Sequence, residues 1–173
     1  DKSEEVSLLA LQGPESLKII SKLISGKLDL QYYKFTFAEI AGLKMLVSRT
    51  GYTGELGYEL YFEGNETVAE NIWNEIMKAG EEFGILPVGL AARDSLRLEM
   101  GYCLYGNDIS AETNVFEAGL GWITKLQKKE FIGKDALAVI KETGVKRKLK
   151  GITTEEKLVP RKDYELVKNG KKI

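Results

Sequence analysis

The segment from Arg49 to Glu59 holds the first group of residues whose types and spacing suit ligand binding. Three glycines within seven residues permit positive φ angles or a close approach of the backbone to a flat ligand. Tyr52 offers an aromatic face, and Glu59 adds a carboxylate just past the loop. A glycine-rich hairpin with a solvated glutamate is the simpler alternative. A phosphate-binding loop is excluded, because no Gly-Lys-Ser/Thr follows and the next expected element is a strand.

A second segment, Gly89–Glu99, is expected to form a helix with Arg93 and Arg97 on one face, since residues four apart are neighbours on a helix. Acidic residues in the same segment permit local ion pairs, and such surface pairs contribute little to stability. The alternative places Arg93 in a cleft, directed at a ligand carboxylate or at Glu59. From the spacing alone, a surface helix is the favoured interpretation.

The third segment, Gly101–Asp108, contains two tyrosines and a cysteine. Cys103 lies between Tyr102 and Leu104 and has no histidine to activate it, which favours a buried structural thiol over a nucleophile. Tyr102 and Tyr105 are compatible with core aromatics. The residues of this segment therefore suggest packing more than chemistry.

The 173-residue chain has no histidine and one cysteine, which excludes several kinds of site. It can form no internal disulfide, no Cys/His zinc site and no Ser-His-Asp or Cys-His machinery. Any general acid or base is a carboxylate, a lysine or a tyrosine, and no metal is expected. Hydrophobic residues make up 43% and charged residues 29%, values typical of a globular protein. The longest mostly apolar stretch, Ile85–Ala92, is far shorter than the ~20 residues of a membrane helix, so no membrane partner is expected.

Charge is distributed unevenly along the chain. Residues 141–173 hold 11 Lys/Arg against five Asp/Glu, while residues 1–140 hold 14 against 21. This shift predicts one domain over residues 1–145 and the beginning of a second over residues 146–173. The basic residues from Lys146 to Lys150 have no interleaved aromatics, so a solvated strand edge is favoured over a nucleic-acid contact.

Hydrophobic periodicity predicts an α+β fold with a mostly antiparallel sheet and packed helices, ferredoxin-like in its element order. Tyr33, Phe35 and Phe37 alternate with polar residues, the pattern of a half-buried strand. Strands are expected at Val6–Leu11, around 33–37, at Lys44–Arg49 and at Tyr58–Phe62. Helices are expected after Pro14, after a cap at Asn65 or Thr67, at Leu90–Met100 and at about Lys134–Glu142. Further strands are expected at Arg147–Thr153 and Asp163–Val167, the latter leading into an Asn169-Gly170 type I′ hairpin turn.

Taken together, these segments resemble the aminomethyltransferase (T-protein) family of the glycine cleavage system. The resemblance extends in order and spacing along nearly the whole chain, which no single short motif achieves. The matching stretches are 8–14 (LLALQGP), 48–57 (SRTGYTGELG), 89–99 (GLAARDSLRLE), 104–108 (LYGND), 113–114 (TN), 117–120 (EAGL), Trp122 and 131–137 (FIGKDAL).

The resemblance implies binding of tetrahydrofolate in a cleft and transfer of a methylene group from the aminomethyl-lipoyl H-protein, with release of ammonia. It implies that Glu59 holds the 2-amino/N3 edge of the pterin, a donor pair that a carboxylate accepts with both oxygens. Arg93 is expected to keep Glu59 ionised and oriented, and Tyr52 and Tyr102 to contact the folate. The implied partners are therefore folate and lipoylated H-protein, with no nucleic acid.

The chain also departs from the family pattern. The family's catalytic aspartate is expected upstream of the 8–14 stretch, so no catalytic residue is expected here and the chain alone is expected to be inactive. The N-terminal portion of the folate-binding domain is expected to be missing, and the C-terminal β-barrel to be present only as its first strands.

Alternative functions stay open from the sequence. Folate-binding proteins of iron–sulfur cluster assembly share the domain, but their cysteine-containing motif has no counterpart at Lys129–Asp135. A folate domain of an amine dehydrogenase fusion and a plain protein-interaction module are the others. The expected location is the cytoplasm, or the mitochondrial matrix in a eukaryote.

Overall fold

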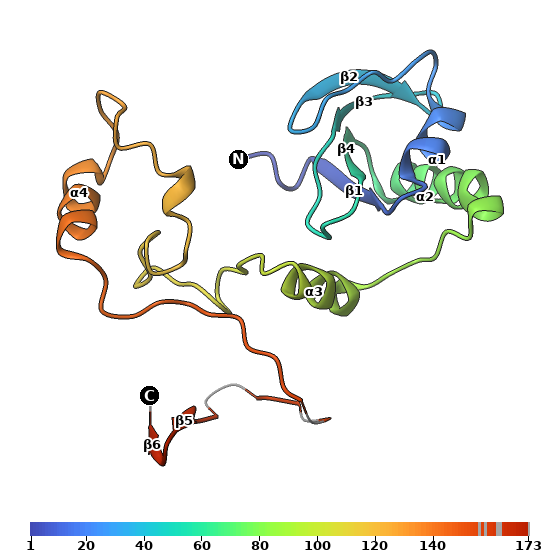
Figure 1. Ribbon diagram of the computed structural model, residues 1–173. Helices are drawn as coiled ribbons and strands as arrows, with labels where there is room; N and C mark the ends of the chain where they lie inside the picture. Colours follow the sequence, from blue (N-terminus) through green and yellow to red (C-terminus); the bar gives the residue numbers. More distant parts are fainter. Residues whose placement is uncertain (156, 158, 162–163, 173) are drawn as a thin grey trace. The chain divides into compact units, whose positions relative to one another are not determined.

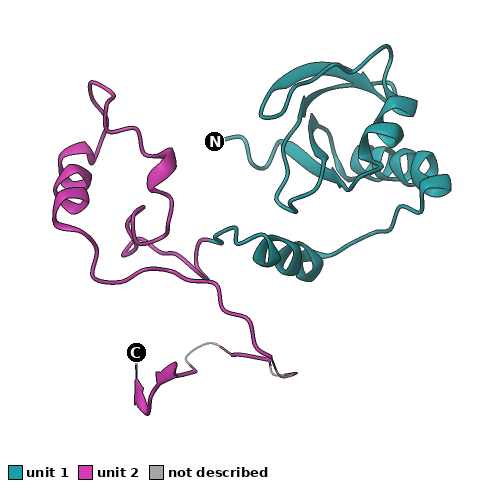
Figure 2. Ribbon diagram, in the orientation of Figure 1, with its two compact units in different colours: residues 1–104 teal, residues 105–173 magenta. Residues whose placement is uncertain are grey.

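The computed structural model describes residues 1–155, 157, 159–161 and 164–172. It separates into two compact units, residues 1–104 (unit 1) and 105–173 (unit 2), coloured separately in Figure 2. Unit 1 contains a four-stranded antiparallel sheet with helices, so the predicted α+β class is confirmed. The domain boundary expected at residues 145–146, and the barrel expected beyond it, stay predictions.

The sheet of unit 1 has the strand order β1-β4-β3-β2, and every neighbouring pair is antiparallel. The strands are β1 (Val6–Gln12), β2 (Phe35–Ile40), β3 (Leu43–Ser48) and β4 (Gly57–Glu63). A two-residue turn joins β2 to β3, and both of its residues have positive φ, 49° at Ala41 and 79° at Gly42. Type I′ hairpins require such angles, so β2 and β3 form a tight hairpin.

Two helices, α1 (Ser16–Leu23) and α2 (Glu66–Gly80), pack side by side against the sheet (Figure 1). The Asn65 side chain accepts a hydrogen bond from the Val68 amide at 3.1 Å, so Asn65 rather than Thr67 caps α2. The core consists of alternate strand residues and the apolar stripes of the helices. It includes Leu11, Met45, Val47, Tyr58, Leu60 and Phe62 from the strands, and Ile19, Ile20, Ile72 and Ile76 from the helices.

The edge strand β2 corrects one prediction about burial. Its residues alternate as expected, but Ile40 is the buried residue and Thr36 and Ala38 are partly buried with it. Phe35 and Phe37 are each 64% exposed, on the opposite side of the sheet. Hydrophobicity indicated the wrong face, because the helices cover only the side that carries Ile40.

The rest of unit 1 follows α2 through η1 (Glu81–Phe83) to α3 (Leu90–Glu99), close to the expected bounds. Unit 2 contains η2 (Gly121–Ile123), α4 (Lys134–Thr143), β5 (Val167–Lys168) and β6 (Lys171–Lys172). No helix in the described part of the chain is both long and apolar enough to traverse a bilayer.

The basic segment of unit 2 differs from its prediction. The strand expected at Arg147–Thr153 is wrong: these residues form no strand, and the Leu149 amide donates to the Glu117 carbonyl at 2.8 Å. Of the strand expected at Asp163–Val167, Asp163 lies outside the described residues and β5 begins only at Val167. The predicted Asn169-Gly170 turn is confirmed, with φ of 52° and 73°.

Candidate functional site

Glu59 projects from β4 on the sheet face opposite the core, and hydroxyl groups hold its carboxylate. Thr50 and Tyr61 both donate to its Oε2, Tyr61 at 3.3 Å. Ser48 Oγ lies 2.8 Å from Thr50 Oγ1. Because the single hydroxyl hydrogen of Thr50 goes to Glu59, Ser48 is the donor in this pair. A short relay of hydroxyls from β3 therefore orients the carboxylate.

The electrostatics of this group leave part of the carboxylate available. Burial raises the pKa of Tyr61, and the charge and hydrogen bond of Glu59 raise it further, so the phenol stays protonated and donates. A carboxylate offers about four lone-pair sites. No described residue donates to Oε1 of Glu59. That oxygen can accept from a ligand that carries N–H donors.

The Gln12 side chain occupies the space beside two glycines of the Arg49–Glu59 segment. A Cβ at Gly51 or at Gly57 would collide with the Gln12 amide group. Gln12 Nε2 donates to the carbonyls of Thr50 at 3.2 Å and Tyr58 at 3.3 Å, which fastens the segment to the end of β1. The absence of a side chain at these two glycines therefore leaves room for the Gln12 amide group, which a larger residue at either position would displace.

Tyr52 connects the same segment with α3. Its ring stacks on Tyr102, with centroids 5.7 Å apart and planes inclined by 23°. The guanidinium carbon of Arg93 lies 4.5 Å from the Tyr52 ring centroid, a cation–π contact. The Tyr52 hydroxyl donates to the carbonyl of Cys103. Three of the predicted site residues thus form one cluster.

Arg97, rather than Arg93, is the buried arginine of α3, with only 3% of its surface exposed. Its Nε and Nη2 bind Asp94 Oδ1 at 2.8 and 2.6 Å, and its Nη1 donates to the Tyr102 carbonyl at 3.0 Å. The local ion pair expected for this helix is therefore present. Because Arg97 also holds the backbone of Tyr102, it positions one half of the aromatic stack.

The predicted residues are only partly brought together as expected. Among the described residues no ion pair joins Arg93 to Glu59; the arginine lies over Tyr52 instead. Sequence reasoning missed the hydroxyl partners of Glu59. Tyr61 could have been found, since it follows Glu59 by two residues on one strand and so shares its face. The role of Ser48 depends on the pairing of β3 with β4, which no local signal reveals.

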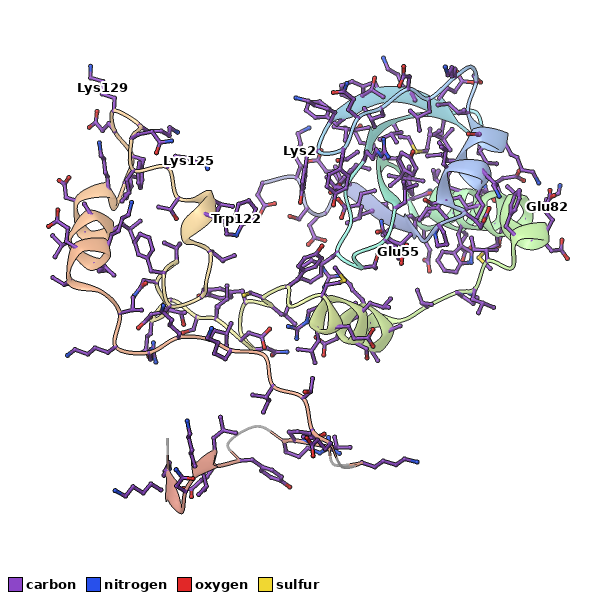
Figure 3. All side chains as sticks on the ribbon, viewed as in Figure 1. Lys2, Glu55, Glu82, Trp122, Lys125 and Lys129 are labelled. Atoms are coloured by element: carbon purple, nitrogen blue, oxygen red, sulfur yellow. The ribbon has the colours of Figure 1, made fainter. Side chains whose placement is uncertain are left out.

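Two hollows lie in the surface of unit 2. One is lined by residues from Lys129 to Ala136, and the other includes Phe116, Ile140 and Trp122, which is labelled in Figure 3. Neither contains a predicted site residue. Within the ranges that the structure describes, no group of three or more His, Cys, Asp or Glu side chains is placed to hold a metal ion.

Fold and site together place the chain among α+β domains that present a carboxylate and an aromatic stack beside an open sheet face. The chain belongs to the family of the GCVT N-terminal domain, whose model matches residues 1–128. The resemblance found in the sequence is therefore confirmed.

Individual relatives agree with this family. The chain is 51% identical over 174 residues to an aminomethyltransferase of Halothermothrix orenii, covering 100% of the chain and 48% of the relative. It is 54% identical over 167 residues to that of Flavobacterium psychrophilum, covering 95% and 46%. The crystal structure of glycine cleavage system aminomethyltransferase T from Bartonella henselae superposes with a TM-score of 0.69 at 33% identity, over 80% of this chain and 37% of that one. The chain spans about half the length of the curated relatives it matches.

Proposed function

We propose that unit 1 binds tetrahydrofolate and acts in the aminomethyl transfer of glycine cleavage. The observation that carries the proposal is the Glu59 carboxylate, oriented through Oε2 by Thr50 and Tyr61 while Oε1 has no donor among the described residues. The 2-amino group and N3 of a pterin form a pair of N–H donors that matches a carboxylate. The named relatives are aminomethyltransferases, which supports this function over iron–sulfur assembly.

The aromatic cluster of Tyr52 and Tyr102 lines one side of the proposed pterin site. Tyr52 and Tyr102 stack with one another, and Arg93 holds the Tyr52 ring through a cation–π contact. In the proposed site these rings contact the folate while Glu59 selects its donor edge. Arg93 adds positive charge near the ligand, which favours a carboxylate-bearing molecule such as folate.

The reaction proposed for the complete protein uses two partners, tetrahydrofolate and the lipoylated H-protein. The methylene group of the aminomethylated lipoyl arm of H-protein passes to tetrahydrofolate, and ammonia leaves. Tetrahydrofolate is the acceptor substrate in this scheme, and no metal takes part. The proposed location is the cytoplasm, on the ground that the relatives named above are bacterial.

Calorimetric titration of the chain with tetrahydrofolate tests the role of Glu59. Glu59→Gln replaces an acceptor by a donor and is expected to weaken binding by about 1.5–3 kcal/mol, the usual worth of a hydrogen bond to a charged group. Glu63→Gln is the matched control, because Glu63 lies four residues along the same strand and is exposed. It is expected to leave the dissociation constant unchanged. Equal affinity of the Glu59→Gln variant and the wild type would remove Glu59 from the site.

A further inference from the structure

Within the described part of the chain, the side-chain amide of Gln12 makes three hydrogen bonds, all with the Arg49–Glu59 segment. Its Nε2 donates to the carbonyls of Thr50 at 3.2 Å and Tyr58 at 3.3 Å, and its Oε1 accepts from the Thr53 hydroxyl at 3.2 Å. A side-chain amide carries two donor hydrogens and one acceptor oxygen. The two acceptors and one donor around Gln12 therefore match an amide, whereas a carboxylate or an aliphatic side chain has no hydrogen to donate.

Two of these contacts are at residues that determine where the Glu59 carboxylate lies. Thr50 is the residue whose hydroxyl donates to Glu59 Oε2. Tyr58 directly precedes Glu59 on β4, so the Tyr58 backbone fixes the point from which the Glu59 side chain extends. Because one nitrogen of Gln12 binds both carbonyls, it holds the hydroxyl donor and the carboxylate at a fixed separation.

Gln12 reaches these carbonyls because two glycines leave its path open. It pairs with Gly57 in the register of β1 and β4, and directly paired residues have their side chains on the same face, here the open face that also carries Glu59. A Cβ at Gly57 or at Gly51 would collide with the Gln12 amide. The side chain therefore crosses Gly57 toward the beginning of the Arg49–Glu59 segment, and it is partly buried there.

We propose that Gln12 is a positioning residue for ligand binding at Glu59, which acts by holding Thr50 where its hydroxyl orients the carboxylate. The inference rests on the proposed function, in which Glu59 and not Gln12 meets the donor edge of the pterin. The affinity of the site then depends on the Gln12 amide through a single hydrogen bond, from Thr50 to Oε2 of Glu59. A substitution of Gln12 is consequently expected to cost affinity only while the Thr50 hydroxyl is present.

Two substitutions remove the amide in different ways. Gln12→Met keeps the length of the side chain and removes all three hydrogen bonds, while Gln12→Glu keeps the shape and the acceptor for Thr53 but has no hydrogen for the two carbonyls. Ser16→Ala is the matched control. Ser16 is 1% exposed, and its Oγ donates to the Leu56 carbonyl at 3.2 Å, so it fastens the same segment at a point away from Thr50.

The test is a double-mutant cycle measured by calorimetric titration with tetrahydrofolate under reducing conditions. Circular dichroism checks that each variant is folded. Gln12→Met and Gln12→Glu are each expected to weaken binding about three- to tenfold, the range for the loss of one hydrogen bond. In a Thr50→Val background, which lacks the hydroxyl, the same substitutions are expected to have no further effect, because the effects of residues that act through one contact are not additive. Ser16→Ala is expected to leave the affinity unchanged in either background.

Other results contradict the positioning role at defined points. If the wild type does not bind tetrahydrofolate, the proposed function fails and the positioning role fails with it. If the wild type binds and both Gln12 variants bind equally well, the positioning role is wrong while the proposed function stands. The role is also wrong if a Gln12 variant loses as much affinity in the Thr50→Val background as in the wild type, or if Ser16→Ala loses as much as Gln12→Met. Either result would mean that the segment needs fastening in general or that Gln12 meets the ligand itself, and that Thr50 is not the link.

Discussion

Unit 1 and unit 2 differ in how much apolar surface they bury. All twelve core residues lie in unit 1, between Leu11 and Ile76, and no described residue of unit 2 is buried. Trp122 is 71% exposed, and Val139 on α4 is 58% exposed. Because burial of apolar surface is the main stabilising term in folding, the difference indicates that the folding free energy of the chain resides in unit 1.

Helix α4 of unit 2 is also less buried and less well capped than helix α2 of unit 1. α2 has an Asn65 cap and a buried stripe that includes Ile72 and Ile76. α4 begins after Gly133, which has a left-handed backbone and no side-chain cap, and it has no buried residue. Isolated helices of ten residues are marginal in water, since most helical stability in proteins comes from packing. Two helices with a similar hydrophobic periodicity in the sequence therefore need not contribute equally to the stability of the protein.

The largest expected effect is on the unfolding free energy, which a core substitution in unit 1 lowers far more than a surface substitution in unit 2. Leu60→Ala removes a fully buried side chain from the centre of the sheet and is expected to cost about 2–5 kcal/mol of unfolding free energy. Val139→Ala on exposed α4 is expected to change it by less than about 0.5 kcal/mol. Each unit contains one tryptophan, so urea unfolding followed through Trp73 in a Trp122→Phe background reports unit 1 alone. Equal losses for the two variants would contradict the comparison.

A smaller effect is expected at the cap of α2. Asn65→Ala leaves the Val68 amide without its side-chain acceptor and is expected to lower stability by about 1 kcal/mol. Asn65→Asp, which keeps an acceptor at the cap, serves as the control and is expected to retain nearly full stability. The same urea titration measures both. A neutral Asn65→Ala variant would mean that packing alone stabilises α2.

The smallest effect concerns a contact within unit 2. The hydrogen bond from Arg147 lowers the pKa of Glu117 most, and the Asn114 amide lowers it further, against a small opposing effect of burial. Since the folded pKa lies below the ordinary value, the contribution of this pair is present above the ordinary glutamate pKa and is lost as the pH falls through the folded pKa. Carboxyl NMR titration is expected to give a low midpoint for Glu117. Arg147→Gln is expected to raise that midpoint, and Lys148→Gln to leave it in place.

The site shows where prediction from sequence succeeds and where it stops. Glu59, Tyr52, Arg93 and Tyr102 were identified from motifs, and the last three do form one cluster. The contact predicted between Arg93 and Glu59 is not found among the described residues: Arg93 is on helix α3 and lies over the Tyr52 ring, and sequence spacing does not say which neighbour a helix side chain meets. The exposed aromatic face of β2 was equally hidden, since alternation in a sequence does not say which side the helices cover.

The sequence by itself determined the elements of unit 1, their order and the α+β class, because turn chemistry, caps and hydrophobic period act over a few residues. It also determined the family, since its motifs recur in order along the chain. Only the tertiary structure decided that Gln12 packs against Gly51 and Gly57, and that Ser48 and Thr50 orient Glu59. These contacts join residues of different strands, and their geometry is set by strand register and by close packing of the whole sheet.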